Sequence, residues 1–81
     1  MMLDVKPDAT VDTRGTYCPM PIVLAKQAIE KLAAGEVLQV FSDDDGVLKD
    51  FPDWCARTGH EYLGTVEEEG EYRSLIRRRD R

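Results

Sequence analysis

The chain is short and acidic, with 81 residues, a formal net charge of −5 and a sequence pI near 4.7. This length predicts a single domain over residues 1–81 with a small core, in which residues 1–8 form a loose N-terminal segment and residues 79–81 a tail. The negative charge disfavours direct nucleic-acid binding, which needs a basic face. No apolar run is long enough for a secretory signal or a membrane span. We therefore expect a soluble, cytoplasmic protein that binds no membrane.

The first predicted elements are a strand and a helix that flank a cysteine. Ala9–Thr13 alternates as a short strand, and Arg14-Gly15 turns the chain toward Cys18-Pro19-Met20-Pro21. Proline is favoured in the first turn of a helix, and a residue that precedes proline adopts the extended angles of an N-cap. Apolar residues then recur at helical spacing, at Ala25, Ala28, Ile29 and Leu32. We predict a helix that begins at Pro19 or Pro21, runs to Ala33 and is closed by Gly35.

Cys18 would lie at the positive end of this helix. A helix N-terminus favours an anion, and thiol pKa values at such places fall from ~8.5 to as low as ~3.5–7.5. The alternative is a small, buried, apolar cysteine. The flanking prolines and the turn at Gly15-Thr16-Tyr17 favour a rigidly presented, reactive thiol. Whether Arg14 or Lys49 lowers its pKa further is left open.

The middle of the chain predicts a central strand followed by an interrupted helix. Glu36–Ser42 is rich in β-branched and aromatic residues. The acidic run Asp43-Asp44-Asp45 favours turn formation or helix N-capping over metal binding, with docking of a basic partner as the alternative. Apolar positions within Val47–Thr58 have helical spacing, but Pro52 interrupts them. We expect a loose first turn and a firm helix over Pro52–Arg57, with Trp54 and Cys55 in the core.

The last third predicts a β-hairpin. Strands are expected at His60–Val66 and Glu71–Arg78, with a polar turn at Glu67–Gly70 between them, and a structural role is expected for His60. The order βαβαββ predicts an α/β two-layer sandwich, a four-stranded mixed sheet with two helices on one face, because right-handed crossovers place both helices on the same side. We expect each crossover helix to join neighbouring parallel strands. Cys18 would then lie in the loop after the first strand, where α/β proteins usually place their sites.

The thiol chemistry can be narrowed by exclusion. Pro21 stands where the resolving cysteine of a C-x-x-C motif would be, which disfavours dithiol exchange. A hydrolytic cysteine enzyme needs a positioned base and an oxyanion pocket. With one histidine and only 81 residues, the chain gives no grounds to expect a deep pocket of this kind. The wide spacing of Cys18, Cys55 and His60 predicts no metal site, and no cofactor is expected. Covalent carriage remains, in which the thiolate takes up a sulfane sulfur and presents it to an acceptor.

The segment Asp12–Pro21 resembles the signature of the TusA family of sulfur carriers, also called SirA-like proteins. The likeness continues at Asp43-Asp44, Lys49–Cys55 and Tyr72–Arg77, and the family's fold is the same βαβαββ sandwich. It implies that Cys18 accepts a persulfide sulfur from a cysteine desulfurase or a rhodanese-type donor and relays it to a downstream acceptor protein. Family pathways feed tRNA thiolation, molybdenum-cofactor sulfur supply or sulfur oxidation. We expect a monomeric, stoichiometric carrier with sulfurtransferase-type chemistry, not a multi-turnover enzyme.

The resemblance also assigns expected roles around Cys18. The residues expected to support the thiol are Pro19, Pro21, Arg14 and Lys49, and those expected to dock partners are Met20, Asp43, Asp44 and Asp50. Two residues depart from the family pattern: Met20 stands where several members have Glu, and Tyr17 stands where a basic residue is common. An apolar rim at these positions implies a partner surface different from that of the tRNA-thiolation members.

Two other functions remain open. The same loop could bind a partner without carrying sulfur, as a regulatory or interaction module. Alternatively, Cys18 and Cys55 could form a thiol redox sensor, which requires their Cα atoms to lie within ~7 Å of each other.

Overall fold

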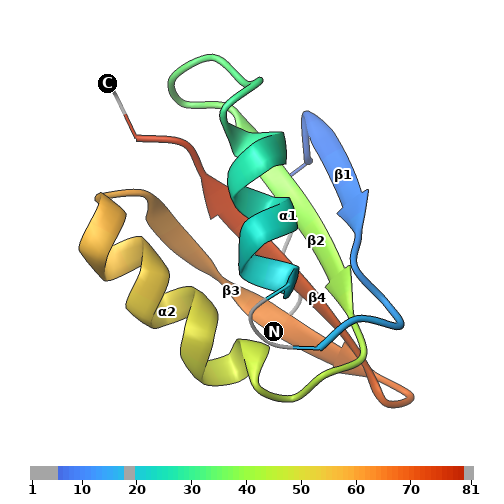
Figure 1. Cartoon of the computed structure of the whole chain (residues 1–81). Coiled ribbons are helices and arrows are strands. Elements are labelled where there is room, and N and C mark those ends of the chain that lie inside the picture. The colour runs from blue at the N-terminus through green and yellow to red at the C-terminus, as the bar shows by residue number, and fades with distance from the viewer. Residues whose placement is uncertain (1–5, 18–19, 80–81) are drawn as a thin grey trace.

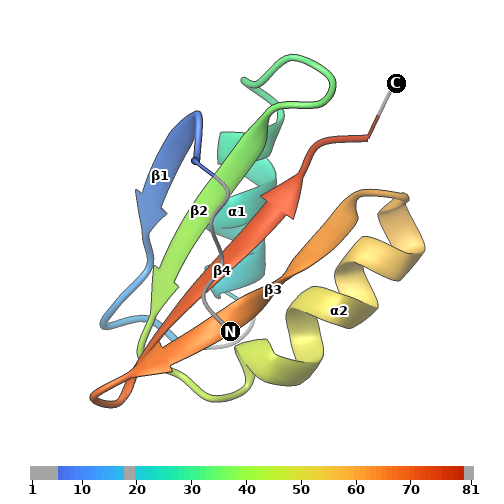
Figure 2. The same cartoon turned by 180° about the vertical axis from the view of Figure 1, so that it is seen from behind.

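A computed structural model of the chain describes residues 6–17 and 20–79 (Figure 1). The elements are β1 (Ala9–Asp12), α1 (Met20–Ile29), β2 (Val37–Ser42), α2 (Val47–Thr58), β3 (Glu61–Glu68) and β4 (Glu71–Arg77). Within the described residues they form a four-stranded mixed sheet, and Figures 1 and 2 show both helices on one of its faces. The predicted fold class and element order are confirmed.

The strand order β1-β2-β4-β3 corrects one expectation. β1 and β2 are parallel neighbours, as predicted, but β4 lies between β2 and β3 and is antiparallel to both. The second crossover therefore does not join neighbouring strands. The burial pattern gives the reason: Ser74, Leu75 and Ile76 of β4 are fully buried, which suits a strand paired on both edges. β3 has exposed glutamates at both ends, which suits an edge strand.

The main core lies between the helices and the sheet. Leu38, Val40 and Ile76 rise from the sheet and meet a buried stripe on each helix. The helix residues of this cluster are Ala25, Ile29, Val47, Phe51 and Cys55. Cys55 is buried, as predicted, and Trp54 packs against the cluster while partly exposed. No helix in the described part of the chain combines the length and the apolar character needed to cross a bilayer.

The helix boundaries differ from the predicted ones. α1 ends at Ile29, before the predicted Ala33. The Glu30 N–H still bonds the Lys26 carbonyl four residues back, but the N–H groups of Lys31 and Leu32 bond three residues back, as in a tightened turn. α2 is regular from Val47, so the expected loose first turn is wrong. Pro52 lies in the second turn and deprives the Leu48 carbonyl of its helical partner. Because Leu48 lies on the exposed side of the helix, water can replace that bond.

Two turns set the ends of these elements. The carboxylate of Asp44 accepts the Gly46 N–H at 3.0 Å, which confirms the predicted turn role of the acidic run. Its predicted N-capping role is wrong, because Gly46 is the N-cap of α2 and makes no side-chain capping bond. β3 extends to Glu68, and Glu69-Gly70 forms a two-residue turn with φ values of 52° and 81°, as tight hairpins require.

Candidate functional site

The candidate site lies where β1 and β2 end, at the same edge of the sheet as the β3–β4 turn (Figure 1). The predicted thiol of Cys18 and the adjoining Pro19 lie outside the described residues. Their described neighbours are both exposed, Tyr17 at 80% and Met20 at 43%. The Met20 N–H donates to the Tyr17 carbonyl at 2.7 Å. The chain therefore reaches the surface on both sides of the Cys18-Pro19 pair, directly before α1.

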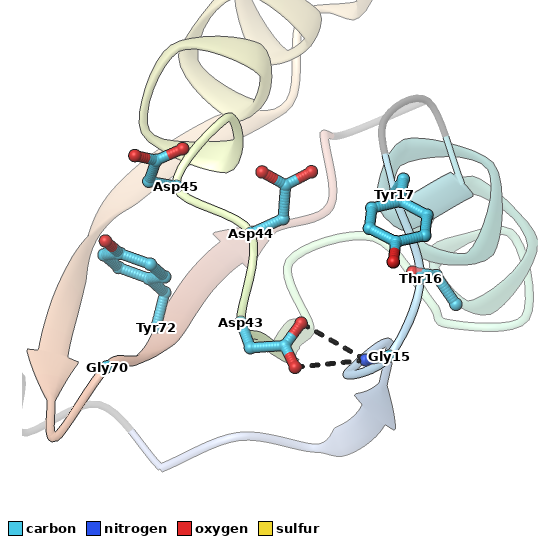
Figure 3. A pocket seen from close by; sticks show the side chains of 8 residues that line it. All are labelled: Gly15, Thr16, Tyr17, Asp43, Asp44, Asp45, Gly70 and Tyr72. Atoms are coloured by element: carbon cyan, nitrogen blue, oxygen red, sulfur yellow. Dashed lines mark hydrogen bonds between the residues drawn. The ribbon is translucent and has the colours of Figure 1, made fainter.

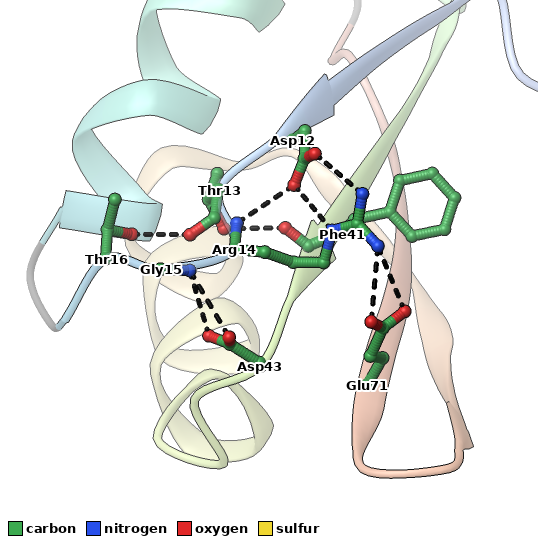
Figure 4. A network of polar contacts seen from close by, with 8 residues as sticks. All are labelled: Asp12, Thr13, Arg14, Gly15, Thr16, Phe41, Asp43 and Glu71. Carbon is green, nitrogen blue, oxygen red and sulfur yellow. Dashed lines mark hydrogen bonds and ion pairs between the residues drawn. The ribbon is translucent and has the colours of Figure 1, made fainter.

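Thr13 anchors the segment that leads to Cys18, a role that the sequence did not reveal. Its side chain is fully buried. Its N–H and its hydroxyl both donate to the Phe41 carbonyl, at 2.8 and 2.7 Å. Its own carbonyl accepts the N–H and the hydroxyl of Thr16, at 3.2 and 2.6 Å (Figure 4). These four bonds fix the turn after β1 to the end of β2.

Arg14 spans the ends of three strands. Its guanidinium pairs with Asp12 of β1 at 2.8 Å and with Glu71 of β4 at 3.2 Å, and lies 5.7 Å from the ring centre of Phe41 on β2 (Figure 4). Hydrogen bonds from the Arg14 side chain and backbone lower the pKa of Asp12 to about 2, and the two carboxylates raise the pKa of Arg14. The charge of Arg14 is thus compensated by two carboxylates, and its side chain braces the edge that carries the site.

Asp43 connects the two loops of the site. The Gly15 N–H donates to both of its carboxylate oxygens, at 3.2 and 3.3 Å (Figure 4). Gly15 has a φ of 85°, a left-handed conformation that side chains rarely adopt. Asp43, which the sequence suggested for docking, therefore also fixes the loop that leads to Cys18.

An acidic hollow of about 450 Å³ adjoins this loop. Figure 3 shows Tyr17 and Thr16 on one side, Tyr72 and Gly70 on the other, and the three carboxylates of Asp43, Asp44 and Asp45 between them. Partial burial and the nearby carboxylates of Glu67, Asp45 and Asp44 raise the pKa of Tyr72. Tyr72 was not predicted as a site residue, because only the folded sheet brings the hairpin beside the loop after β2. Asp45 was considered only as part of the acidic run, in the alternative that this run docks a basic partner.

The other predicted site residues that the structure describes do not line this hollow. Pro21 is buried in the first turn of α1, and Met20 is exposed beside it. Lys49 and Asp50 lie in the first turn of α2, where Lys49 is exposed and the Asp50 N–H donates to the Gly46 carbonyl at 2.9 Å. The structure thus brings Asp43 and Asp44 together with Gly15–Tyr17, and places Lys49 and Asp50 on a separate element.

The second cysteine and the histidine have other surroundings. Cys55 is 3% exposed, and burial raises the pKa of its thiol to about 11. His60 follows the far end of α2, with its ring 5.3 Å from that of Trp54. Within residues 6–17 and 20–79, no group of three or more His, Cys, Asp or Glu side chains is arranged to hold a metal ion.

Comparisons with known proteins all point to the same family. The family model "Sulfurtransferase TusA" matches residues 9–78. The sulfur carrier protein TusA of Pseudomonas entomophila is 41% identical over 78 residues, which cover 96% of this chain and 98% of that protein. The TusA of Allochromatium vinosum is 37% identical over 71 residues, 88% of this chain and 93% of that one.

A solved structure agrees with this family. The crystal structure of a SirA-like protein from Desulfitobacterium hafniense superposes with a TM-score of 0.76 at 28% identity, and covers 85% of this chain and 95% of that one. The chain therefore belongs to the TusA family of sulfur carrier proteins, whose role brings it into contact with sulfur donor and acceptor proteins.

Proposed function

We propose that Cys18 is the residue that carries the sulfur, and that it does so as a persulfide. The observation that supports this most directly is the position of its described neighbours, since Tyr17 and Met20 are both exposed and Met20 begins α1. A thiolate at this position would be reachable by a second protein and favoured by the positive end of the helix.

The proposed transfer balances without an added oxidant. The Cys18 thiolate attacks the outer sulfur of a donor persulfide, R–S–SH. A new S–S bond forms on Cys18, the donor's S–S bond breaks, and the donor leaves as the thiolate R–S⁻. A thiolate of the acceptor then attacks the outer sulfur on Cys18 in the same way and restores the Cys18 thiolate. The donor class is a cysteine desulfurase or a rhodanese-type protein.

Cys55 is a poor candidate for either sulfur carriage or a redox pair. Its side chain is buried in the main core, and a thiol whose pKa is about 11 is almost entirely protonated near neutral pH. This disfavours the sensor made of Cys18 and Cys55.

The residues around Cys18 would hold the thiol in place. We assign Pro19 and Pro21 to a stiff start of α1, and Arg14 to bracing the strand ends, because its charge already meets Asp12 and Glu71. Lys49 is exposed in α2, and is the remaining candidate for a cation that favours the thiolate.

The acidic hollow would receive a basic side chain of the partner protein. Carboxylates of Asp43, Asp44 and Asp45 line it, and Tyr17 and Tyr72 provide aromatic walls, a combination that suits a guanidinium or an ammonium group. Exposed Tyr17 and Met20 would pack against an apolar part of the same partner surface.

Sulfur loading tests the role of Cys18. The protein is incubated with a cysteine desulfurase and L-cysteine, and its intact mass is recorded without reductant. We expect the unmodified chain and Cys55→Ser to gain the mass of one sulfur atom and Cys18→Ser to gain none. Loading of Cys18→Ser, or no loading of the unmodified chain by either a desulfurase or a rhodanese with thiosulfate, would refute the assignment.

Charge-neutral variants test the docking role of the hollow. The double variant Asp44→Asn, Asp45→Asn is compared with Asp53→Asn, which removes an exposed carboxylate from α2 outside the hollow. We expect the double variant to weaken binding to the donor by about tenfold or more, since each lost ion pair contributes roughly 1 kcal/mol or more at a partly desolvated interface, whereas Asp53→Asn stays within about twofold. Equal effects of the two variants would contradict a specific role of the hollow.

A further inference from the structure

A second hollow, of about 230 Å³, lies between the C-terminal halves of α1 and α2. Arg78 and Arg79, which follow β4, also line it, and it lies at the opposite end of α1 from Met20, where that helix begins (Figure 1). It is lined by Lys26, Ile29, Glu30, Trp54, Thr58, His60, Arg78 and Arg79. The proposed sulfur chemistry uses none of these residues.

The charge of this hollow is opposite to that of the chain. Its lining includes the cations Lys26, Arg78 and Arg79, whereas the chain as a whole has a net charge of −5. Glu30 is the carboxylate among the lining residues, and Lys26 pairs with it at 3.4 Å. The charge of Arg78, which is bonded to neutral carbonyl oxygens, therefore makes the potential in the hollow positive.

Arg78 is held rigidly at the end of α1. Its Nη1 donates to the carbonyls of Ile29 at 3.4 Å and Glu30 at 3.2 Å, and also to that of Leu32. These oxygens carry no formal charge, so the positive charge of Arg78 persists. A guanidinium has five N–H donors in a planar fork, and the bonds to α1 occupy only one of its nitrogens. Arg79 is held similarly, through Nη1 to the Thr58 carbonyl at the end of α2.

His60 adds a neutral donor. Its Nδ1 accepts the Arg79 backbone N–H at 3.0 Å, which places the ring proton on Nε2 when the ring is neutral. Burial and the charges of Arg79 and Arg78 lower its pKa, so the neutral form prevails at neutral pH. The Trp54 ring lies beside the His60 ring and also lines the hollow.

We propose that this hollow binds a small tetrahedral oxyanion of the phosphate or sulfate class. Arg78 would supply the net positive charge, and His60 would donate through Nε2–H. Lys26 pairs with Glu30 but has three N–H donors, and would donate a further hydrogen bond to the anion. Fixed donors from α1, from the segment after α2 and from the segment after β4 can meet several oxygens of one anion, and charge-assisted hydrogen bonds are the stronger kind. The rival interpretation is that the two arginines only satisfy the carbonyls at the helix ends, in which case no anion binds.

The chain carries its own reporters for the test. It has one tryptophan and one histidine, and both line this hollow. Sodium phosphate, sodium sulfate and sodium acetate are titrated separately at constant ionic strength set with sodium chloride. We expect phosphate or sulfate, but not acetate, to produce a saturable change in Trp54 fluorescence and in the NMR signals of the His60 ring.

Matched variants locate the site. Lys26→Ala and His60→Gln should each weaken binding by about fivefold or more, because each removes a donor to the anion. Lys31→Ala, a lysine exposed just after α1 and outside the lining of the hollow, should leave affinity and sulfur loading unchanged. The proposal would be overturned by a linear response to all salts, by equal effects of Lys26→Ala and Lys31→Ala, or by preferential binding of acetate. Sulfur loading of Lys26→Ala, measured in parallel, keeps this test independent of Cys18.

Discussion

Thr13 and Arg14 stabilise the segment before Cys18 in two different ways. Thr13 acts through short, neutral hydrogen bonds from a fully buried side chain. Arg14 acts through ion pairs whose partners are about half exposed, and exposed pairs contribute only ~0–1 kcal/mol each. Substitution of Thr13 should therefore lower stability more than substitution of Arg14, although the charged arginine is the more conspicuous residue in the sequence.

Thr13→Val tests this difference. The change keeps the shape of the side chain and removes the hydroxyl that donates to Phe41, so the free energy of unfolding should fall by about 1 kcal/mol. Urea denaturation followed by Trp54 fluorescence measures it. Thr10→Val, at an exposed position of β1, the strand that Thr13 follows, is the control and should change stability by less than about 0.5 kcal/mol. Equal losses in both variants would contradict the anchoring role of Thr13.

The local features of the site could be predicted from the sequence, whereas its long-range contacts could not. The turn before Cys18 and the start of α1 depend on neighbouring residues, and glycine and proline marked them. The bonds from Thr13 to Phe41 and from Gly15 to Asp43 join residues 28 positions apart. No local pattern encodes such contacts, because they depend on which strands pair and in what register.

At the scale of elements, α2 shows how far a local rule can be overridden. Proline in a helix interior costs about 3 kcal/mol, yet α2 is regular on both sides of Pro52. Val47, Phe51 and Cys55 form a buried stripe along one face, and burial of side chains of this size contributes roughly 1.5–3 kcal/mol each. Packing of the helix against the sheet thus outweighs the effect of the proline.

Pro52→Ala should therefore stabilise the protein. The change restores an N–H that can bond the Leu48 carbonyl, and it removes the ~3 kcal/mol cost of a proline inside a helix. Alanine also makes the unfolded chain more flexible, which cancels about 1 kcal/mol of this gain. We expect a net gain of about 2 kcal/mol in the free energy of unfolding, measured by urea denaturation. A loss of stability would indicate that the proline ring makes packing contacts that alanine cannot replace.

The segment after β4 links β4 to α2 through His60, and this link should respond to pH. The pKa of His60 is lowered in the folded protein, so the unfolded chain binds its proton more readily. The free energy of unfolding should then be unaffected by this group well above pH 6.5 and should fall as the pH drops through about 6.5. Urea denaturation between pH 8 and pH 5 measures this slope, which should be smaller in His60→Gln. An unchanged slope in that variant would assign the pH dependence to other groups.

Strand order was the main error at this scale. Periodicity identified every strand and both helices, and the tight turn at Glu69-Gly70 placed β3 beside β4. Periodicity could not show whether β3 or β4 of that hairpin pairs with β2. The fully buried run Ser74-Leu75-Ile76 suggests in retrospect a strand with neighbours on both sides, since an edge strand of a two-layer fold rarely buries three residues in succession.

At the scale of the whole molecule, charge is distributed unevenly between the two ends of the sheet. Among the described residues at the end that carries the acidic hollow, carboxylates outnumber the cations Arg14, Lys49 and Arg73. These carboxylates are Asp12, Asp43, Asp44, Asp45, Glu67, Glu68, Glu69 and Glu71. At the other end, Arg78 and Arg79 follow β4. Such a distribution would turn the acidic end toward a basic partner during the approach of the two proteins.

The association rate with a basic donor protein should therefore depend steeply on salt. We expect the association rate constant to fall by about tenfold or more between 20 and 500 mM sodium chloride (concentrations chosen because the Debye length falls from roughly 20 to about 4 Å), while the dissociation rate changes much less. Stopped-flow fluorescence measures both rates. A salt-independent association rate would exclude electrostatic steering by this end of the molecule.

We propose that Cys18 presents the working thiol at the acidic end of the molecule, whereas Cys55 is enclosed in the core. Competitive alkylation of the folded protein at neutral pH, followed by peptide mass mapping, tests it most directly. We predict that Cys18 is alkylated rapidly and that Cys55 reacts only after denaturant is added. Equal labelling of both cysteines in the folded protein, or labelling of Cys18 only after unfolding, would contradict the claim.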